Sequence, residues 1–384
     1  MSSRVLARAR AACAWALLAV AVAGCTSGGS GSSVVTVSGK TLTIYLSDAP
    51  TSQPQVARDV LDAERLAWSQ QTSHTVGGFA LRLKVLHGKI SDQARTAIQD
   101  QTAIAYLGEV VPHSSYASLG ITNAVDLLQV TPTDTALELT QASPVVTGSP
   151  GVYYQSFSTY GQTFVRVVPT TAQEAKAQVQ EMQALGVTKL YVSDDGSPYG
   201  ATIANAVKHD LSGSISAAGS LSAADGAFYG TSSPAGAERF FARGASSNPS
   251  LKLFAPSALD DPTLAPQLSG AANLYISAPG FLKQNLTPAG STFVSQFTTA
   301  YGHAPVPQAI FGYEAMSAVL AVLREAGAQA NNRSTVVHNF LAIKNRQSVL
   351  GTYSISSTGD TSIAPFVFSR VRQGKLVPFA QVQG

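Results

Sequence analysis

A repeated alternation of strand and helix patterns constrains the fold of this sequence more than any other feature. Between residues 171 and 211, a helical apolar stripe ends at Gly186, an apolar strand covers residues 190–192, and a loop leads into a second helical stripe. Strands that alternate with helices in this way are typical of a parallel sheet covered by helices. The alternation begins at Thr41 and continues past Ala326, so it predicts an α/β fold for nearly the whole chain.

Local signals place the ends of individual elements. Residues 171–174 (TAQE) fit a capping box, which predicts a helix that begins at Thr171 and has Glu174 in the box. Apolar residues at helical spacing predict a long helix over residues 312–326. The pattern changes over residues 351–379, which read as paired strands with glycine and polar turns.

The first 25 residues have the pattern of a bacterial export signal. Basic residues precede an apolar run over residues 11–23, which is shorter than the roughly 20 residues that a bilayer span needs. Val-Ala-Gly-Cys at residues 22–25 resembles the lipobox of bacterial lipoproteins, in which the cysteine is lipidated and becomes the mature N-terminus. We expect removal of residues 1–24, lipid on Cys25 and a Gly/Ser tether over residues 25–39. The alternative is an ordinary cleaved signal that contains a cysteine by chance.

Removal of the signal changes what the composition implies. The remaining 384 − 24 = 360 residues exceed the roughly 250–300 at which one core stops growing, so two domains are expected. The signal contains three of the 25 Lys and Arg residues and no acid, which leaves 25 − 3 = 22 basic residues against 22 acidic ones. This balance gives no indication of binding to nucleic acid or to an anionic membrane surface. Cys13 would leave with the signal and Cys25 would carry lipid, so we expect no disulfide and no thiolate metal site.

The sequence contains no recognisable catalytic motif. Zinc-binding, paired-cysteine, nucleophile-elbow and phosphate-loop patterns are absent from it. The six histidines are scattered without the spacing of metal ligands. The acidic pairs at residues 194–195 and 260–261 are each explained most simply by a turn. We therefore expect a protein that is not an enzyme and that uses no metal or cofactor.

Five segments carry a family resemblance when they are taken in order. They are VTPTDTALELT at residues 130–140, FVRVVP at 164–169, KLYVSD through YG at 189–200, FGYEA at 311–315 and GD at 359–360. Together they resemble the branched-chain amino-acid type of periplasmic binding protein, the substrate-binding subunit of ABC importers. The ordered set spans nearly all of the chain that follows the signal.

The resemblance implies a type I periplasmic binding protein fold, in which two Rossmann-like lobes are joined by three crossovers. Lobe 1 would comprise residues 40–166 and 278–350, and lobe 2 residues 167–277 and 351–384. A small molecule would bind between the lobes, where strand carboxyl ends and helix N-termini meet. The resemblance also implies an ABC permease as partner, a monomer, and a place on the extracytoplasmic face of the cell membrane. The alternative within the same fold is a ligand-sensing receptor subunit without transport.

The resemblance further implies which residues contact the ligand. The family's ligand-binding positions fall on Ser114, Ser115, Thr133, Thr135, Tyr199, Ser232 and Ser257. Thr133 and Thr135 match positions that hold the ligand's carboxylate and amine, and Tyr199 matches a tyrosine that lines the cleft from lobe 2. A structural role is an open alternative for these three, because threonine often caps helices and tyrosine often packs in cores. Pro112 is an alternative to the two neighbouring serines.

Departures from the family pattern bear on the ligand. Ser232 stands in a stretch where the family often has an aromatic contact, and Ser257 stands where amino-acid binders carry a glutamate that pairs with the ligand's ammonium group. Residues 47–50 (SDAP) replace the family's glycine-rich loop at the cleft. A buried ammonium group needs an anionic partner. The sequence therefore favours a neutral or purely anionic ligand, such as an amide or an organic acid, over a zwitterionic branched-chain amino acid.

Overall fold

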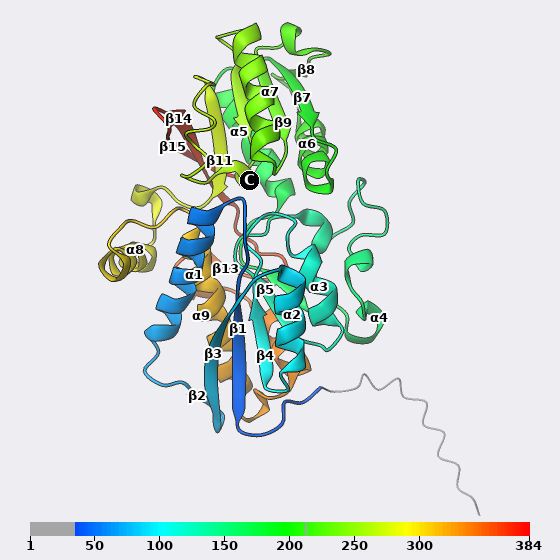
Figure 1. Cartoon of the computed structure of the whole chain (residues 1–384), viewed down its shortest axis with the longest axis vertical. Coiled ribbons are helices and arrows are strands. Elements are labelled where there is room, and N and C mark those ends of the chain that lie inside the picture. Colours follow the sequence, from blue (N-terminus) through cyan, green and yellow to red (C-terminus); the bar gives the residue numbers. More distant parts are fainter. Residues whose placement is uncertain (1–34, 212) are drawn as a thin grey trace, which may run out of the picture. The chain divides into compact units, whose positions relative to one another are not determined.

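The computed structural model describes residues 35–211 and 213–384, and the span Ser33–Gly384 forms one compact unit. The expected signal (residues 1–24) and Cys25 lie outside the described residues. The described chain contains two large sheets, one in each lobe, and a small two-stranded sheet. Figure 1 shows helices on both faces of each large sheet, which confirms the predicted α/β fold.

Lobe 1 is built on a six-stranded sheet with the order β2-β3-β1-β4-β5-β6. Its strands are β1 (Thr41–Asp48), β2 (Thr75–Val76), β3 (Phe79–His87), β4 (Ala103–Leu107), β5 (Leu128–Thr131) and β6 (Phe164–Arg166). All neighbouring pairs are parallel except β2 with β3. Its helices are α1 (Pro54–Ser69), α2 (Ile90–Gln99), α3 (Tyr116–Asn123), α8 (Pro288–Tyr301), α9 (Ala309–Ala326) and α10 (Arg333–Leu341).

Helices cover both faces of this sheet, and the strand sequences reflect it. Strand β4 is buried at all five positions, as expected for a central strand of a parallel sheet. Helices α1 and α9 pack together in the large core on one face, whereas α2 packs with Tyr45 and Tyr106 on the other. The long helix predicted over residues 312–326 is α9, which begins three residues earlier than predicted, at Ala309.

Lobe 2 is built on a seven-stranded sheet with the order β15-β14-β11-β10-β9-β7-β8. Its strands are β7 (Lys189–Asp194), β8 (Ser216–Ala217), β9 (Gly226–Gly230), β10 (Lys252–Ala255), β11 (Leu274–Pro279), β14 (Pro365–Arg372) and β15 (Lys375–Gln383). Helices α5 (Thr171–Ala184) and α6 (Pro198–Asp210) cover one face, and α7 (Pro234–Ser247) covers the other. β14 pairs antiparallel with β11 and with β15, so the C-terminal strands are paired as predicted.

Short elements fill the connections. They are α4 (Phe157–Tyr160), the hairpin β12 (Arg346–Ser348) and β13 (Gly351–Tyr353), and the 3-10 turns η1 (Leu137–Leu139), η2 (Gly151–Tyr153), η3 (Leu221–Ala223), η4 (Ser257–Leu259), η5 (Lys283–Asn285) and η6 (Gly327–Gln329). Of these, η4 lies at the contact between the lobes, where its Ser257 carbonyl accepts from Gln53 Nε2.

Helix α5 begins at Thr171 and has a capping box, but the box starts at Thr170, one residue before the predicted position. The hydroxyl of Thr170 accepts from the backbone N–H of Gln173, and the Gln173 side chain accepts from the backbone N–H of Thr170. Thr171 and Glu174 were the predicted pair. Glu174 is fully buried and bonds to Ser257 instead, so a tertiary contact decides which local pattern forms the cap.

The chain passes between the lobes three times, after β6, after β11 and before β14. Strand β11 stays in the lobe 2 sheet up to Pro279, and Ile355 still packs in the lobe 1 core. Arg166, at the end of β6, ties two crossovers together, since its Nε lies 2.9 Å from Asp360 Oδ1. Its guanidinium group also donates to the backbone carbonyls of Asp134 and Ala136.

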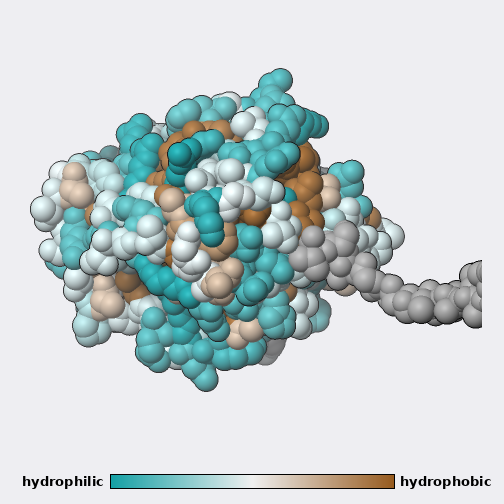
Figure 2. Space-filling view, turned by 90° about the horizontal axis from the view of Figure 1, so that it is seen from below, coloured by the Kyte–Doolittle hydropathy of each residue, from teal (hydrophilic) through white to brown (hydrophobic). Residues whose placement is uncertain are grey.

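The surface is mainly polar. On the face in Figure 2, hydrophilic and neutral residues cover most of the area, with smaller hydrophobic areas between them. Over the described ranges, the large hydrophobic side chains that remain exposed are Tyr116, Val152, Phe157 and Val377. No helix in the described part of the chain combines the length and the apolar character needed to cross a bilayer.

Candidate functional site

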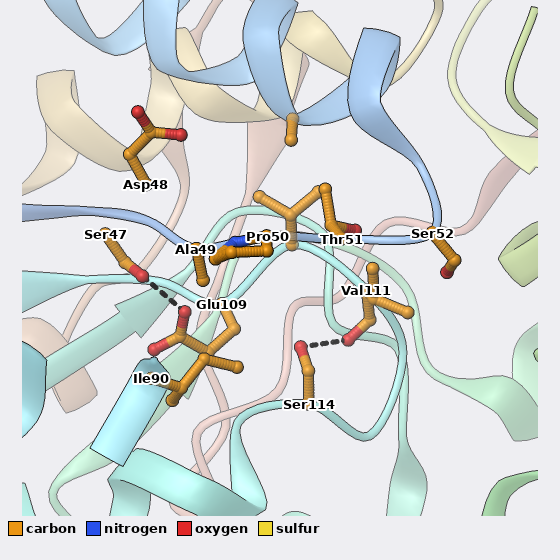
Figure 3. A pocket seen from close by; sticks show the side chains of 12 residues that line it. Ser47, Asp48, Ala49, Pro50, Thr51, Ser52, Ile90, Glu109, Val111 and Ser114 are labelled. Carbon is orange, nitrogen blue, oxygen red and sulfur yellow. Dashed lines mark hydrogen bonds between the residues drawn. The ribbon is translucent and has the colours of Figure 1, made fainter. Parts of the chain in front are cut away.

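In lobe 1 the strand order changes direction at β1. Strand β1 pairs with β3 on one side and with β4 on the other, so the chain leaves β1 in one direction and returns on the opposite side. Open parallel sheets bind ligands beyond the carboxyl ends of the strands at such a switch point. A pocket of about 210 Å³ lies there, between residues 47–52 at the end of β1 and residues 109–114 after β4 (Figure 3).

Glu109 supplies a buried acidic wall of this pocket. Its side chain is only 2 % exposed, and its carboxylate accepts from Ser47 Oγ at 2.5 Å and from the Tyr106 hydroxyl at 2.8 Å. No ion pair within residues 35–211 and 213–384 includes Glu109. Burial raises the pKa of Glu109 to about 7, although hydrogen bonds from Ser47, Tyr106 and Ser118 favour the charged form.

The remaining walls are mostly aliphatic. They comprise Ala49, Pro50, Thr51, Ser52, Ala57, Ile90, Val110, Val111 and Ser114, together with Asp48. Ser114 Oγ donates to the carbonyl of Val111 at 2.5 Å, which holds the loop after β4 in a tight turn. The pocket therefore joins an apolar wall to a wall of carboxylate and hydroxyl groups, a combination that suits a small molecule with one polar end.

Contacts between the lobes begin next to the pocket. Gln53 follows the pocket residue Ser52, and its Nε2 donates to the backbone carbonyls of Ser257 at 2.9 Å and Asp260 at 3.0 Å. Gln308 Nε2, at the start of α9, donates to Asp260 Oδ1 at 2.9 Å. The first turn of α1 is therefore both a neighbour of the pocket and part of the contact with lobe 2.

Asp261 reaches from lobe 2 to the N-terminus of α1. Its Oδ2 accepts from the backbone N–H groups of Gln55 at 2.9 Å and Val56 at 3.0 Å. The N-cap residue Gln53 makes no side-chain cap bond, so Asp261 takes the capping role from a distant part of the chain. The turn predicted for this acidic pair is also present, because Asp261 Oδ1 accepts from the Thr263 N–H and hydroxyl.

The predicted ligand residues of lobe 1 have different surroundings. Ser114 lines the pocket, whereas Ser115 is buried, and its hydroxyl accepts a backbone N–H of the loop 109–114. Thr133 is also buried, and its hydroxyl donates to a carbonyl of that loop at 2.7 Å. The Thr135 hydroxyl is buried without a hydrogen-bond partner in the described chain. Ser115 and Thr133 thus hold the pocket loop in place.

The predicted ligand residues of lobe 2 do not belong to the lining of this pocket. Tyr199 is buried in the first turn of α6, within electrostatic reach of Glu174. Ser257 is buried in η4, and its hydroxyl donates to Glu174 Oε2 at 2.9 Å. Ser232 is half-buried between β9 and α7. The structure therefore places Ser114, of the seven predicted residues, in the pocket wall.

A carboxylate lies next to residue 257 even though that residue is a serine, and it comes from helix α5. Glu174, on α5, accepts from the Ser257 N–H at 2.6 Å and from Ser277 Oγ at 2.6 Å. Burial raises the pKa of Glu174 to about 7, and burial likewise raises the pKa of the neighbouring Asp260 to about 7. The absence of a glutamate at residue 257 therefore does not leave the contact between the lobes without carboxylates.

Three acidic residues that shape the site were not predicted from the sequence as site residues. Glu109 had one available signal, its place directly after Gly108 at the carboxyl end of an apolar strand. Glu174 was assigned to a helix cap and Asp261 to a turn, because a local pattern does not reveal contacts 83 or 206 residues away along the chain. In the described ranges, no group of His, Cys, Asp and Glu is arranged to hold a metal ion.

Comparisons with known proteins agree with this architecture. The family model for periplasmic binding protein matches residues 208–375. The leucine-binding protein LivK from Thermotoga maritima superposes with a TM-score of 0.72 at 20 % identity, covering 89 % of this chain and 98 % of LivK. LivJ from Streptococcus pneumoniae, a branched-chain amino-acid transporter substrate-binding protein in complex with isoleucine, gives 0.70 at 14 % identity, covering 90 % and 100 %.

An ABC transporter solute-binding protein from R. palustris, in complex with benzoate, has a TM-score of 0.67 at 17 % identity and covers 89 % of this chain and 96 % of its own. No curated protein matches the chain in sequence. The fold is that of a type I periplasmic binding protein. The family model and these neighbours confirm the fold that the five sequence segments predict.

Proposed function

We propose that this protein is an extracytoplasmic solute-binding protein that captures a small polar metabolite for an ABC importer. The metabolite is an amino acid, an amide or an organic acid that fits the pocket in lobe 1. The observation that carries the proposal is the position of that pocket. It lies at the switch point of a type I periplasmic binding fold, beside the contacts that Gln53 and Asp261 make between the lobes.

Binding is coupled to the lobes through the loop after β1. A solute in the pocket contacts residues 47–52, which lead directly into Gln53 and the first turn of α1. Because this turn contacts lobe 2, a solute that orders the loop favours the arrangement in which the lobes touch. The permease recognises that arrangement, and the protein's own chemistry consists of binding alone.

The N-terminal sequence supports a lipid anchor as part of the same proposal. Cys25 carries lipid and holds the monomeric body at the extracytoplasmic face of the membrane through the tether 25–39. Labelling of expressing bacteria with a fatty-acid analogue should mark the full chain, and Cys25→Ala should abolish the label. A label that survives this substitution would show that the anchor assignment is wrong.

A thermal-shift screen of the Ser33–Gly384 body against amino acids, amides and aromatic or aliphatic acids tests the binding function. A ligand present at 100 times its Kd adds about 2.7 kcal/mol of stability, which is measurable as a rise in Tm. Calorimetric titration of each hit then gives its affinity and stoichiometry, and we expect one site per chain.

A matched pair of variants assigns binding to the pocket. Ala57→Leu places three extra carbons on the α1 wall of the pocket, and we expect it to weaken binding at least tenfold. Ala321→Leu makes the same change at a half-buried alanine of α9 outside the pocket and should leave binding intact. Binding that is equally strong in both variants would place the solute elsewhere, and a screen without any hit would contradict the function.

A further inference from the structure

The charges around the lobe 1 pocket are strongly one-sided. Its lining contains the carboxylates of Asp48 and Glu109, and the described residues that line it include no Lys, Arg or His. Asp48 has a partner of its own, since its Oδ2 lies 2.8 Å from His87 Nδ1. Among the described residues, the Glu109 side chain has the hydroxyl groups of Ser47, Tyr106 and Ser118 as hydrogen-bond partners, and none of these groups is a cation.

The helices, strand and loop that pack around Glu109 bring acidic or uncharged side chains to it. Glu64 faces Glu109 from α1, and the carboxylate of Asp134 faces it from the loop after β5; both side chains are buried. Tyr106, on β4, donates a hydrogen bond to Glu109. The uncharged side chain of Ser118, on α3, is a further hydrogen-bond partner of Glu109. Burial and the charge of Asp134 raise the pKa of Glu109, and no cationic side chain in the described part of the chain offsets them.

Two arginines line an adjoining pocket. Arg58 and Arg65 lie on the walls of a neighbouring pocket that shares residues 48–51 and 57 with this one, and neither arginine is in the lining beside Glu109. Arg65 is also paired with Asp62, at 3.4 Å. The described residues therefore supply no cation to the charged form of Glu109, and a cationic solute would stabilise that form.

We infer that the solute presents a protonated amine to the pocket and that Glu109 is the specificity-determining residue that pairs with it. A carboxylate offers about four acceptor positions, and Ser47, Tyr106 and Ser118 occupy up to three of them, which leaves a position for an ammonium N–H donor. Charge-assisted hydrogen bonds of this kind are stronger than neutral ones. The inference rests on the proposed function and narrows it, because it disfavours the neutral and purely anionic ligands that the sequence alone favours.

Three probes of similar size test this inference in the Ser33–Gly384 body. Benzylamine, benzyl alcohol and benzoate share one ring and carry a positive, a neutral and a negative polar group. In calorimetric titration at pH 8, we expect benzylamine to bind at least tenfold more tightly than the other two. Between pH 8 and pH 6 the charged fraction of a carboxyl with a pKa of about 7 falls about tenfold. The affinity for benzylamine should fall by the same factor, while that for benzyl alcohol stays constant.

Substitution isolates the role of the carboxylate. Glu109→Gln keeps the shape of the side chain and should remove both the preference for benzylamine and its pH dependence. Glu238→Gln, at an exposed acid of α7, is the matched control and should keep both. The pH profile of the unmodified protein decides the question even if Glu109→Gln fails to fold.

Other results would overturn the inference. It is wrong if no amine binds, if benzoate binds as tightly as benzylamine, or if Glu109→Gln leaves the preference unchanged. If leucine or an organic acid binds without regard to Glu109, the solute-binding function stands and only the charge assignment fails. If neither the amines nor the broader metabolite screen gives a ligand, both proposals fail.

Discussion

Replacement of Asp261 by alanine should loosen the contact between the lobes without unfolding either one. Asp261 comes from lobe 2 and caps α1 of lobe 1 through two backbone N–H bonds, at 2.9 Å to Gln55 and 3.0 Å to Val56. No side chain of lobe 1 makes this cap, because Gln53 directs its side-chain amide to lobe 2 instead. In Asp261→Ala the first turn of α1 loses both its cap and a nearby negative charge.

The expected magnitude follows from the helix terminus. Loss of an N-cap side chain costs about 0.5–2 kcal/mol, and a carboxylate at a partly buried helix N-terminus contributes up to about 2 kcal/mol. The two effects overlap, so we expect Asp261→Ala to weaken the closed arrangement by about 1–2 kcal/mol, a change of about 5- to 30-fold in the closed-to-open ratio. The contacts of Gln53 and Gln308 with lobe 2 remain in place, so closure is weakened rather than abolished.

Small-angle X-ray scattering of the ligand-free body measures this opening as a larger radius of gyration. Asp225→Ala is the matched control, because Asp225 also accepts backbone N–H bonds, from Thr188 and Lys189, but entirely within lobe 2. We expect Asp225→Ala to lower stability without a change in radius. The reasoning is refuted if Asp261→Ala leaves the radius unchanged, or if both variants enlarge it equally.

Three further predictions concern the crossovers, the buried acids and a tight helix contact. Arg166→Met breaks a buried ion pair with Asp360 and should cost about 3–5 kcal/mol in urea unfolding; a loss below 1 kcal/mol would contradict this. Burial raises the pKa values of Glu174 and Asp260 to about 7, so their contribution to stability is present at pH 4 and is lost as the pH rises through 7. The urea concentration at the unfolding midpoint should decrease as the pH is raised from 5 to 8. In the variant with both Glu174→Gln and Asp260→Asn this midpoint should depend less on pH. An unchanged pH dependence in the variant would contradict the assignment to these two acids. Gly312→Ala places a Cβ 2.5 Å from a carbonyl oxygen of α1 and should cost about 1–3 kcal/mol; full stability would show that the helices can move apart freely.

The fold was predictable because its signals are local and repeated. Each strand and helix carries its own periodic pattern, and an error of a few residues at one end does not change the alternation. The prediction of α9 shows this, since the helix begins at Ala309 rather than at residue 312 and still covers the same face of the sheet. The C-terminal strands β14 and β15 were predicted for the same reason.

The capping box of α5 marks where local patterns stop being sufficient. The sequence offers two overlapping boxes, Thr170 with Gln173 and Thr171 with Glu174, and both satisfy the same spacing rule. The choice depends on Ser257 and its neighbour Ser277 in lobe 2, which engage the carboxylate of Glu174. That information lies more than 80 residues away, so no window of the size of a helix turn contains it.

The same limit explains why the ligand's charge was inferred differently from the sequence and from the structure. In the sequence, residues 47–50, Ser232 and Ser257 depart from the family pattern, and an acid is missing at residue 257. In a parallel sheet, however, the carboxyl ends of several strands meet at one edge, and the charge of a pocket there is the sum over all of them. Glu109 follows β4 at that edge, and Glu64 and Asp134 approach it from α1 and the loop after β5. A lost carboxylate at one position can therefore be replaced from another strand, and the charge that a solute must carry is decided by the assembled edge.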